Sequence, residues 1–417
     1  MSSAGSKKDA QRIGIAMIAG LIVGLILFKT GQGELVAYVK PVGAIFIRLL
    51  KMMIVPLVLS SIYMSMVNLG TPEQLGAMGR KAMGYYFLTT AIAVMFGLIF
   101  VNLINPGVGA DLGTQGLDGL SGNMAERVQA TEGLWKTIIG VIVDAIPTNP
   151  FQAMANSTVL QVIVFAMMFG WATLYHMKES QPITSFMTSL EHLSMVMVHG
   201  IMKFAPIGIF VLMLDVMAKS GYGALISLSK YIATVIIGLL CHACFLMFVA
   251  SWRLKKSPLF ILKGIYPALM TAFSTSSSAA TLPITMTSVE ENLGVHNETA
   301  KFVLPLGATV NMDGTALYES VAAIFIAQAY GIDLSIGQQM VIFMTASLAA
   351  VGAAAIPGAG LITMSIVLGA VGLPLEGIGL ILAVDRLLDM FRTTVNVFGD
   401  AVGTIVVDSY MDREGKV

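Results

Sequence analysis

Charged residues are scarce in this chain. Only 12% of its 417 residues are Asp, Glu, Lys or Arg, and 56% are hydrophobic, whereas an ordinary soluble domain carries about 25% charged residues. The mean hydropathy is correspondingly high, at +0.82. This balance excludes an ordinary soluble domain and predicts that the lipid bilayer is the solvent of the chain.

Net charge is lacking as well, because 24 basic residues balance 24 acidic ones. The charges lie between the apolar runs and form no basic surface that would attract nucleic acid. Cysteine is limited to Cys241 and Cys244, with His242 between them in an apolar run. A zinc site would need further ligands, and none lies nearby in the sequence. We therefore expect no nucleic-acid partner and interpret these three residues as packing residues.

Long apolar runs dominate the sequence, and a spanning helix needs about 20 such residues. The run near 132–175 is interrupted by Pro147 and Pro150, which predicts broken helical pieces, and a polar, Gly-rich loop near 106–131 precedes it. No A-x-A cleavage site follows the first run, so we expect a retained span. The eight predicted spans lie near 12–30, 40–69, 82–105, 132–175, 193–218, 223–252, 302–329 and 378–407.

Basic residues occur at every second boundary between these runs, and such boundaries face the cytoplasm. The pattern predicts a multi-pass protein of the cell membrane whose N- and C-termini are both cytoplasmic. The residues concerned are Lys7, Lys8, Arg12, Arg80, Lys81, Lys178, Arg253, Lys255 and Lys256.

Two further segments are long enough to enter the membrane but have polar or small residues at their centres. They are Ser274–Pro283 and Ala353–Gly360. Non-helical backbone is tolerated at membrane depth only inside protein or beside water, so both segments are predicted to be re-entrant hairpins. Each hairpin is followed by a span, and the two units have opposite orientations. Inverted units with interrupted segments indicate a transporter whose binding site lies near the midplane.

The last span carries polar residues that share one helical face. At about 100° per residue, five of them fall within roughly 80° of arc. Three carboxylates and one guanidinium leave an excess of negative charge, which indicates bound cations. The residues of this face are Asp385, Asp389, Arg392, Asn396 and Asp400, with Thr393 beside them.

The preceding span contains Asn311-Met-Asp-Gly-Thr315. Gly314 is expected to break the helix and release carbonyl groups, and oxygen ligands of this kind suit sodium rather than a transition metal. Glu319, one turn past Thr315, is a candidate proton carrier, with a hydrogen-bonded structural acid as the alternative. Hairpin tips present free N–H groups to an anion, and Ser277, Ser278 and Gly360 are predicted to help bind a carboxylate there.

At these motifs the chain strongly resembles the glutamate transporter family of dicarboxylate and amino acid:cation symporters, in its acidic amino acid branch. The resemblance covers nearly the whole chain, and also includes Ile356-Pro-Gly-Ala-Gly360. It implies an all-α polytopic membrane protein with eight transmembrane helices, two re-entrant hairpins and inverted repeats. It further implies a homotrimer that works by an elevator mechanism.

The resemblance also implies a division into scaffold and transport parts. The scaffold would comprise residues 1–81 with spans one and two, and residues 106–222 with spans four and five. The transport part would comprise residues 82–105 with span three, and residues 223–417 with span six, both hairpins, span seven and span eight. The second hairpin would close over the substrate as the extracellular gate.

Individual roles follow from the same resemblance. Asp389 would bind the substrate ammonium and Arg392 its side-chain carboxylate. The implied substrate-binding residues are Ser277, Ser278, Thr315, Ile356, Gly360, Asp389, Arg392, Thr393 and Asn396. Sodium would be held in three sets: Gly307, Asn311, Asn396 and Asp400; Tyr86, Thr89, Thr90, Asn311 and Asp313; and Thr309, Met312, Ala350, Val351 and Ala353.

The sequence departs from familiar members where they place a second arginine, since Ser276 and Met390 occupy those positions. We therefore expect Asp389 to lack a second basic neighbour. Glu319 occurs where proton-coupled relatives have glutamate, so the coupling ion is sodium, a proton or both. No organic cofactor is expected.

The leading hypothesis is symport of aspartate or glutamate. A four-carbon dicarboxylate carrier is the runner-up, although its substrate would bring no ammonium for Asp389, and a neutral amino acid would leave Arg392 without a carboxylate. An anion channel is disfavoured by two hairpins that close a midplane site. An intramembrane enzyme is disfavoured because no histidine accompanies the buried serines as a base.

Overall fold

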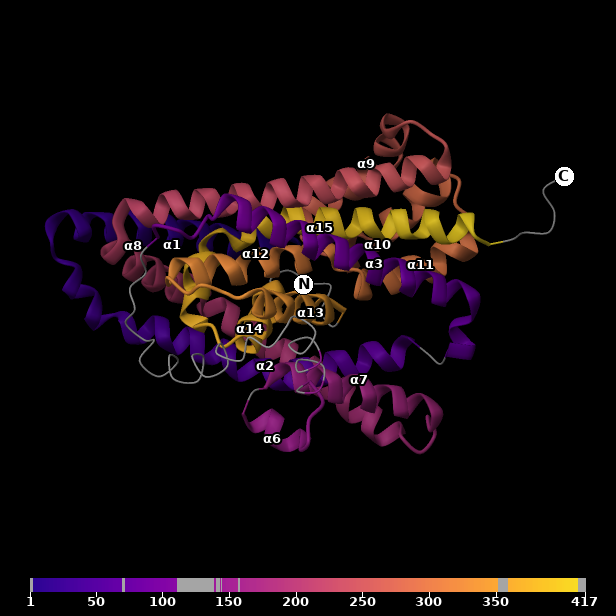
Figure 1. Cartoon of the computed structure of the whole chain (residues 1–417), viewed down its shortest axis with the longest axis horizontal. Helices are drawn as coiled ribbons and strands as arrows, with labels where there is room; N and C mark the ends of the chain where they lie inside the picture. The colour runs from indigo at the N-terminus through magenta and orange to yellow at the C-terminus, as the bar shows by residue number, and fades with distance from the viewer. Residues whose placement is uncertain are drawn as a thin grey trace.

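The computed structural model describes residues 3–69, 72–110, 139, 143, 145–156, 158–351 and 359–411, and all regular elements in these ranges are helical. The predicted all-α fold is therefore confirmed (Figure 1). The predicted loop near 106–131 and the tip of the second hairpin lie largely outside the described residues.

The first three predicted spans coincide with α1 (Ser3–Thr30), α2 (Lys40–Leu69) and α3 (Pro72–Ile104), and a short helix η1 (Gly33–Tyr38) joins the first two. The interrupted fourth run contains α6 (Pro150–Ala155) and α7 (Val159–Tyr175). The side chain of Asn149 caps α6 by accepting a hydrogen bond from Phe151 N at 3.0 Å. The prolines and this cap explain the broken helical pieces that the sequence predicts.

The predicted spans five and six lie within α8 (Gln181–Leu254), which consists of two helices that meet at a kink with non-helical backbone at Gly221. Gly221 has φ +53°, a conformation that glycine adopts without a steric penalty. By length and hydropathy, the described helices Gly76–Ile104 and Gly221–Leu254 can each span a membrane, and the pair Gln181–Val198 and Lys203–Lys219, bent by 54°, forms a third candidate. No other helix or helix pair in the described ranges meets these criteria, so the count of eight spans stays a prediction.

Both predicted hairpins are pairs of helices. The first consists of α9 (Pro258–Thr275) and α10 (Ser278–Thr287), followed by η2 (Ser288–Asn292). The chain reverses at Ser276, which has φ +51°. The second hairpin consists of α13 (Ile336–Val351) and α14 (Ala359–Ala370), and both of its helices pack against α12.

The predicted seventh span consists of α11 (Asn297–Val310) and α12 (Asp313–Ala329). The helix breaks at Asn311, which has an extended backbone with φ −92° and ψ 91°. The expectation that Gly314 breaks the helix is therefore wrong. Gly314 lies inside α12, where a Cβ would come within 2.5 Å of the carbonyl oxygen of Arg392, so a close approach of two helices requires this glycine.

The last predicted span is α15 (Ile378–Ser409), which follows the short helix η3 (Leu375–Gly377). In Figure 1, α15 runs alongside α8 through the middle of the molecule. Helix α12 is buried on all sides except at Gln328. Such a helix has no polar face for solvent and belongs to the centre of a core.

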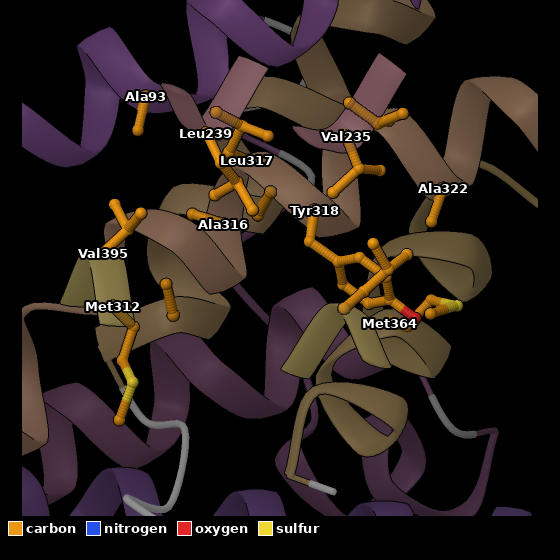
Figure 2. Packing of buried hydrophobic residues seen from close by; sticks show 14 of the residues in the cluster. Ala93, Val235, Leu239, Met312, Ala316, Leu317, Tyr318, Ala322, Met364 and Val395 are labelled. Atoms are coloured by element: carbon orange, nitrogen blue, oxygen red, sulfur yellow. The ribbon is translucent and has the colours of Figure 1, made fainter. Parts of the chain in front are cut away.

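The core around α12 joins helices that are distant in the sequence. Figure 2 shows Leu317 and Tyr318 of α12 beside Val235 and Leu239 of α8, with Met364 of α14 near the Tyr318 ring. All five side chains are buried. Helix α12, which begins just after the break at Asn311, is thus held by apolar contacts along its length.

The close packing of α3 on α12 can be tested at Gly97. A Cβ there would contact Ser320 Oγ and lie 2.9 Å from the Leu317 carbonyl oxygen, whereas nothing lies within 4 Å of a Cβ at Gly84 on the same helix. We expect Gly97→Val to destabilise the protein by about 1–3 kcal/mol, the usual cost of overpacking a core. Thermal unfolding of the purified protein, with Gly84→Val as control, measures the effect. Equal melting temperatures for both variants would contradict this packing.

Candidate functional site

The predicted polar face of α15 points into the interior. Asp385, Asp389, Arg392, Asn396 and Asp400 are each exposed by 5% or less, and Thr393 beside them is also buried. Their spacing of three or four residues places them on one helical face. Burial of so many charges is costly unless each one has a partner, and both α15 itself and its neighbouring helices provide such partners.

Arg392 lies at the centre of one group of contacts. Its Nε donates to Asp389 Oδ1 at 2.9 Å, and its Nη1 lies 3.3 Å from Asp385 Oδ1. The Tyr318 ring packs under the guanidinium with its centroid 4.4 Å from Cζ, and the Tyr318 hydroxyl donates to Asp385 Oδ1 at 2.8 Å. Nothing in the sequence pattern singled out Tyr318, although it lies one turn past Thr315.

The outer edge of the guanidinium has unused donors. Nη1 and Nη2 of Arg392 are buried and make no hydrogen bond with any described residue. Gly360 of α14 packs directly against this edge, because a Cβ there would lie 2.5 Å from Arg392 Cζ. Two parallel N–H groups of this kind bind a carboxylate bidentately. The guanidinium edge that the second hairpin covers is therefore the candidate contact for an acidic ligand.

Asp389 has a second basic neighbour. Its Oδ2 lies 3.7 Å from Nη1 of Arg386, one turn earlier on α15, whose side chain is 28% exposed. We expected Asp389 to lack such a neighbour because Ser276 and Met390 occupy the usual positions of the second arginine. That expectation is wrong, since an arginine three residues earlier reaches the same carboxylate. The i, i+3 spacing was the available signal for this pair.

Asn311, at the break between α11 and α12, joins a second group of polar atoms. Its Nδ2 donates to Asp400 Oδ1 at 2.9 Å and to the Asn396 carbonyl at 3.3 Å. Its Oδ1 is buried and has no hydrogen-bond partner among the described residues. A Cβ at Gly307 would lie 2.7 Å from Asp400 Oδ1. The first predicted sodium set is thus brought together, with an unused oxygen at its centre.

Asp313, the first residue of α12, lies in a third group. Its Oδ1 accepts hydrogen bonds from Thr90 Oγ1 at 2.6 Å and from Thr89 Oγ1 at 3.4 Å. The Tyr86 hydroxyl, which donates to the Val303 carbonyl at 3.2 Å, lies beside Gly307. Two threonines of the second predicted sodium set therefore meet Asp313, where α3 reaches the break in the seventh span, whereas Tyr86 lies beside Gly307 of the first set.

Asn396 connects α15 to the start of α12. Its Oδ1 accepts from the Gly314 N–H at 2.7 Å, and its Nδ2 donates to Thr315 Oγ1 at 3.3 Å and contacts Met312 Sδ at 3.3 Å. Three residues predicted to contact substrate or sodium are therefore already in contact with one another. These contacts fix the side-chain amide of Asn396 in one orientation.

The first hairpin tip uses one of its serines to cap a helix. Ser277 Oγ accepts a hydrogen bond from the Ala280 N–H at 3.2 Å, which satisfies one free donor at the start of α10. Ser278 is buried in the first turn. The hydroxyl of Ser276 is buried without a hydrogen-bond partner in the described part of the chain. Sequence reasoning treated Ser276 only as a missing arginine, so this polar group was overlooked.

Glu319 is fully buried in the middle of α12. Among the described residues, neither carboxyl oxygen of Glu319 has a hydrogen-bond partner. The Thr363 side chain of α14 lies close enough to interact with the Glu319 carboxyl group. A charged carboxylate without partners is very costly in such surroundings, whereas the protonated form is neutral. Glu319 therefore contacts the second hairpin rather than an aqueous surface.

The third predicted sodium set is only partly described. Thr309 is exposed, and its hydroxyl donates to the Leu306 carbonyl at 2.9 Å. Met312 and Ala350 are buried, and Val351 is the last residue of α13. Ala353 lies outside the described residues, as does Ile356 of the substrate set. The third sodium set therefore stays a prediction.

Cys241 and Cys244 are free thiols, and His242 between them points to Asp313. Within the described ranges, no group of three or more His, Cys, Asp or Glu side chains could hold a metal ion. The described groups around α12 and α15 instead combine carboxylate, amide and hydroxyl oxygens. Oxygen donors of this kind suit hard cations such as sodium.

The amino-acid sequence is similar to a known protein family and to several of its members. The model of the sodium:dicarboxylate symporter family matches residues 10–410. A proton/sodium-glutamate symport protein of Bacillus subtilis is 33% identical over 405 residues, which cover 96% of this chain and 92% of that protein. A proton/glutamate-aspartate symporter of Escherichia coli is 32% identical over 402 residues, covering 95% and 92%. Excitatory amino acid transporter 3 of Mus musculus is 37% identical over 445 residues, covering 96% and 84%.

Proposed function

Because the chain belongs to the sodium:dicarboxylate symporter family, a family of membrane transporters, we propose that it carries acidic amino acids into the cell together with sodium ions, protons or both. Its relatives named as glutamate or glutamate-aspartate symporters match it over nearly their whole length. The names support the substrate class, and the site geometry supports it independently.

The observation that carries the proposal is the buried pair of Arg392 and Asp389. In the structure these groups neutralise each other through a 2.9 Å hydrogen bond. An acidic amino acid brings both complements, since its ammonium pairs with Asp389 and its side-chain carboxylate with the Nη atoms of Arg392, which make no hydrogen bond with a described residue. The substrate therefore replaces the internal ion pair by two new ones without leaving a buried charge unpaired.

Sodium is the proposed coupling ion, and two sites are proposed to bind it. One lies at Gly307, Asn311, Asn396 and Asp400, where the Asn311 Oδ1 lacks a partner. The other lies at Asp313 with Tyr86, Thr89, Thr90 and Asn311. Two buried carboxylates without a nearby guanidinium call for cations, and these oxygen ligands match what sodium requires.

The wider architecture is proposed from the family. Eight spans and two re-entrant hairpins in inverted repeats would form a homotrimer in the lipid bilayer of the cell membrane, with both termini cytoplasmic. Residues 1–81 and 106–222 would form the scaffold, and residues 82–105 and 223–417 would move as an elevator. The contact between Gly360 and Arg392 supports a gate at the second hairpin, because a ligand on the guanidinium lies directly under it.

One observation favours a second candidate, a four-carbon dicarboxylate. Asp389 lies near both Arg386 and Arg392, so its charge is partly balanced even without a substrate ammonium. Arg386 is more exposed than Arg392, however, and exposed charge pairs contribute little. The amino acid remains the better complement to the site.

The first functional prediction concerns the substrate. Succinate lacks the ammonium and alanine lacks the carboxylate, and each unpaired buried charge costs about 2–5 kcal/mol, which is more than tenfold in affinity. Succinate and alanine should therefore displace bound aspartate from the purified protein at least tenfold less well than glutamate does. Equal displacement by succinate would support the dicarboxylate candidate instead.

Arg392→Cys should weaken aspartate binding at least tenfold and shift preference towards neutral amino acids, because it removes the charge that they leave unpaired. Thr394→Cys, on the adjacent turn but outside the polar face, controls for the new thiol. Radiolabelled uptake into proteoliposomes measures both substrates. Retained preference of Arg392→Cys for aspartate over alanine would show that another group binds the side-chain carboxylate.

The second prediction concerns sodium. Asp400→Asn removes a carboxylate from the first sodium set, and losing one charge-assisted contact costs about 1.5–3 kcal/mol, or roughly 10- to 100-fold in affinity. The sodium concentration for half-maximal aspartate binding should rise by that factor. Asp408→Asn, two turns further along α15, is the matched control. Aspartate affinity that is the same with and without sodium in the wild type would remove the proposed coupling.

The third prediction concerns the proton. Glu319→Gln keeps the shape and the neutral state but carries no exchangeable charge. It should bind aspartate within about twofold of wild type, and it should lose any acceleration of uptake by an inward proton gradient. Uptake is measured with sodium equal on both sides and the membrane potential clamped, with the exposed Glu298→Gln as control. Identical responses of wild type and Glu319→Gln to the gradient would make Glu319 a structural residue.

A further inference from the structure

His242 of α8 is in direct contact with the candidate sodium site. Its Nε2 lies 2.9 Å from Asp313 Oδ2, and both side chains are 0% exposed. The sequence alone favoured a packing role for His242, between two cysteines in an apolar run. His242 and Asp313 lie 71 residues apart in the chain. A packing role alone does not explain a buried polar contact between them.

The two oxygens of Asp313 have different partners. Oδ1 accepts from Thr90 and Thr89 of α3, in the candidate sodium set, and Oδ2 contacts only His242 among the hydrogen bonds described for it. An ionised carboxylate only accepts hydrogen bonds, so Nε2 of His242 carries the hydrogen that joins them. His242 Nδ1 is buried and has no partner among the described residues. The ring therefore has one polar contact, and that contact is the carboxylate.

Aromatic neighbours hold the imidazole in place. The Phe96 ring of α3 meets it edge-on at 6.3 Å, and the Phe245 ring of α8 is stacked at 6.0 Å. A ring fixed on two sides presents Nε2 in one direction. Asp313 is thus held from one side by a rigid donor, and its other oxygen is left facing the cation set.

We propose that His242 is a positioning residue for sodium, which orients the Asp313 carboxylate so that Oδ1 faces Tyr86, Thr89, Thr90 and Asn311. The inference rests on the proposed function, and it adds the sixth span to the residues that determine sodium affinity. Partners of this kind orient metal ligands, and their loss typically weakens metal binding about 10- to 100-fold. The contact also ties α8 to the first residue of α12, beside the break in the seventh span.

Two substitutions separate positioning from packing. His242→Phe keeps an aromatic ring between Phe96 and Phe245 but removes the donor. His242→Gln keeps an N–H donor for Asp313 but removes the ring. Positioning predicts that His242→Phe raises the sodium concentration for half-maximal aspartate binding about 10- to 100-fold, and that His242→Gln raises it less. Aspartate affinity at saturating sodium should stay close to that of the wild type for both variants.

The experiment uses the full-length protein, purified and reconstituted, with sodium chloride titrated against aspartate binding. Cys244→Ala, exposed on the same helix, is the matched control. A double-mutant cycle adds His242→Phe to Asp313→Asn, where the positioning contact is already altered and no further weakening is expected. If His242→Phe does not yield folded protein, His242→Leu takes its place as the donor-free variant.

Several results would overturn the inference. They are an unchanged sodium dependence in the donor-free variant, a larger loss in His242→Gln than in His242→Phe, or full additivity in the double-mutant cycle. Failure of the proposed function has a different signature, because the wild type itself would then show no sodium-dependent aspartate binding.

Discussion

The buried charge of Arg392 constrains the arrangement of the helices around it. A guanidinium that is 1% exposed costs several kcal/mol unless it is paired. Asp389 and Asp385 provide the opposite charge from the same helix, and α12 provides the Tyr318 ring and hydroxyl. Helices α12 and α15 must therefore be aligned so that Tyr318 lies opposite Arg392 and Asp385. The second hairpin covers the outer edge of the guanidinium through Gly360.

The helix break at Asn311 creates a second group of buried polar contacts between these helices. Because the chain is extended there, the side chains of Asn311 and Asp313 meet groups from three other helices. Asp400 comes from α15, the threonines come from α3, and His242 comes from α8. The arginine partners lie elsewhere, at Asp385 and Asp389, so the two acids near the break depend on cations for charge balance. Separation of the acids that pair with arginine from the two that do not divides the site into a substrate part and a sodium part.

Much of this could be predicted from the sequence, because it depends on local spacing. Apolar runs predicted α1, α2 and α3 closely, and serine-rich and glycine-rich interruptions predicted the paired helices of both hairpins. The three- and four-residue spacing from Asp385 to Asp400 predicted a shared face, which the structure buries. Helical periodicity is a property of neighbouring residues, so a single chain contains enough information to predict it. The resemblance to a transporter family came from the same motifs.

Only the tertiary structure decided which residues face one another across helices. It placed the helix break at Asn311 rather than Gly314, gave Asp389 a neighbour in Arg386, put the Tyr318 ring under Arg392, and brought His242 to Asp313. Periodicity tells which face of a helix is polar, but not which of several helices meets that face. That choice is made by packing of the whole core, in which α8, α12 and α15 bury their apolar sides together. The sequence by itself therefore determined the helices and the polar stripe, and the packing of distant helices determined the partners of each charge.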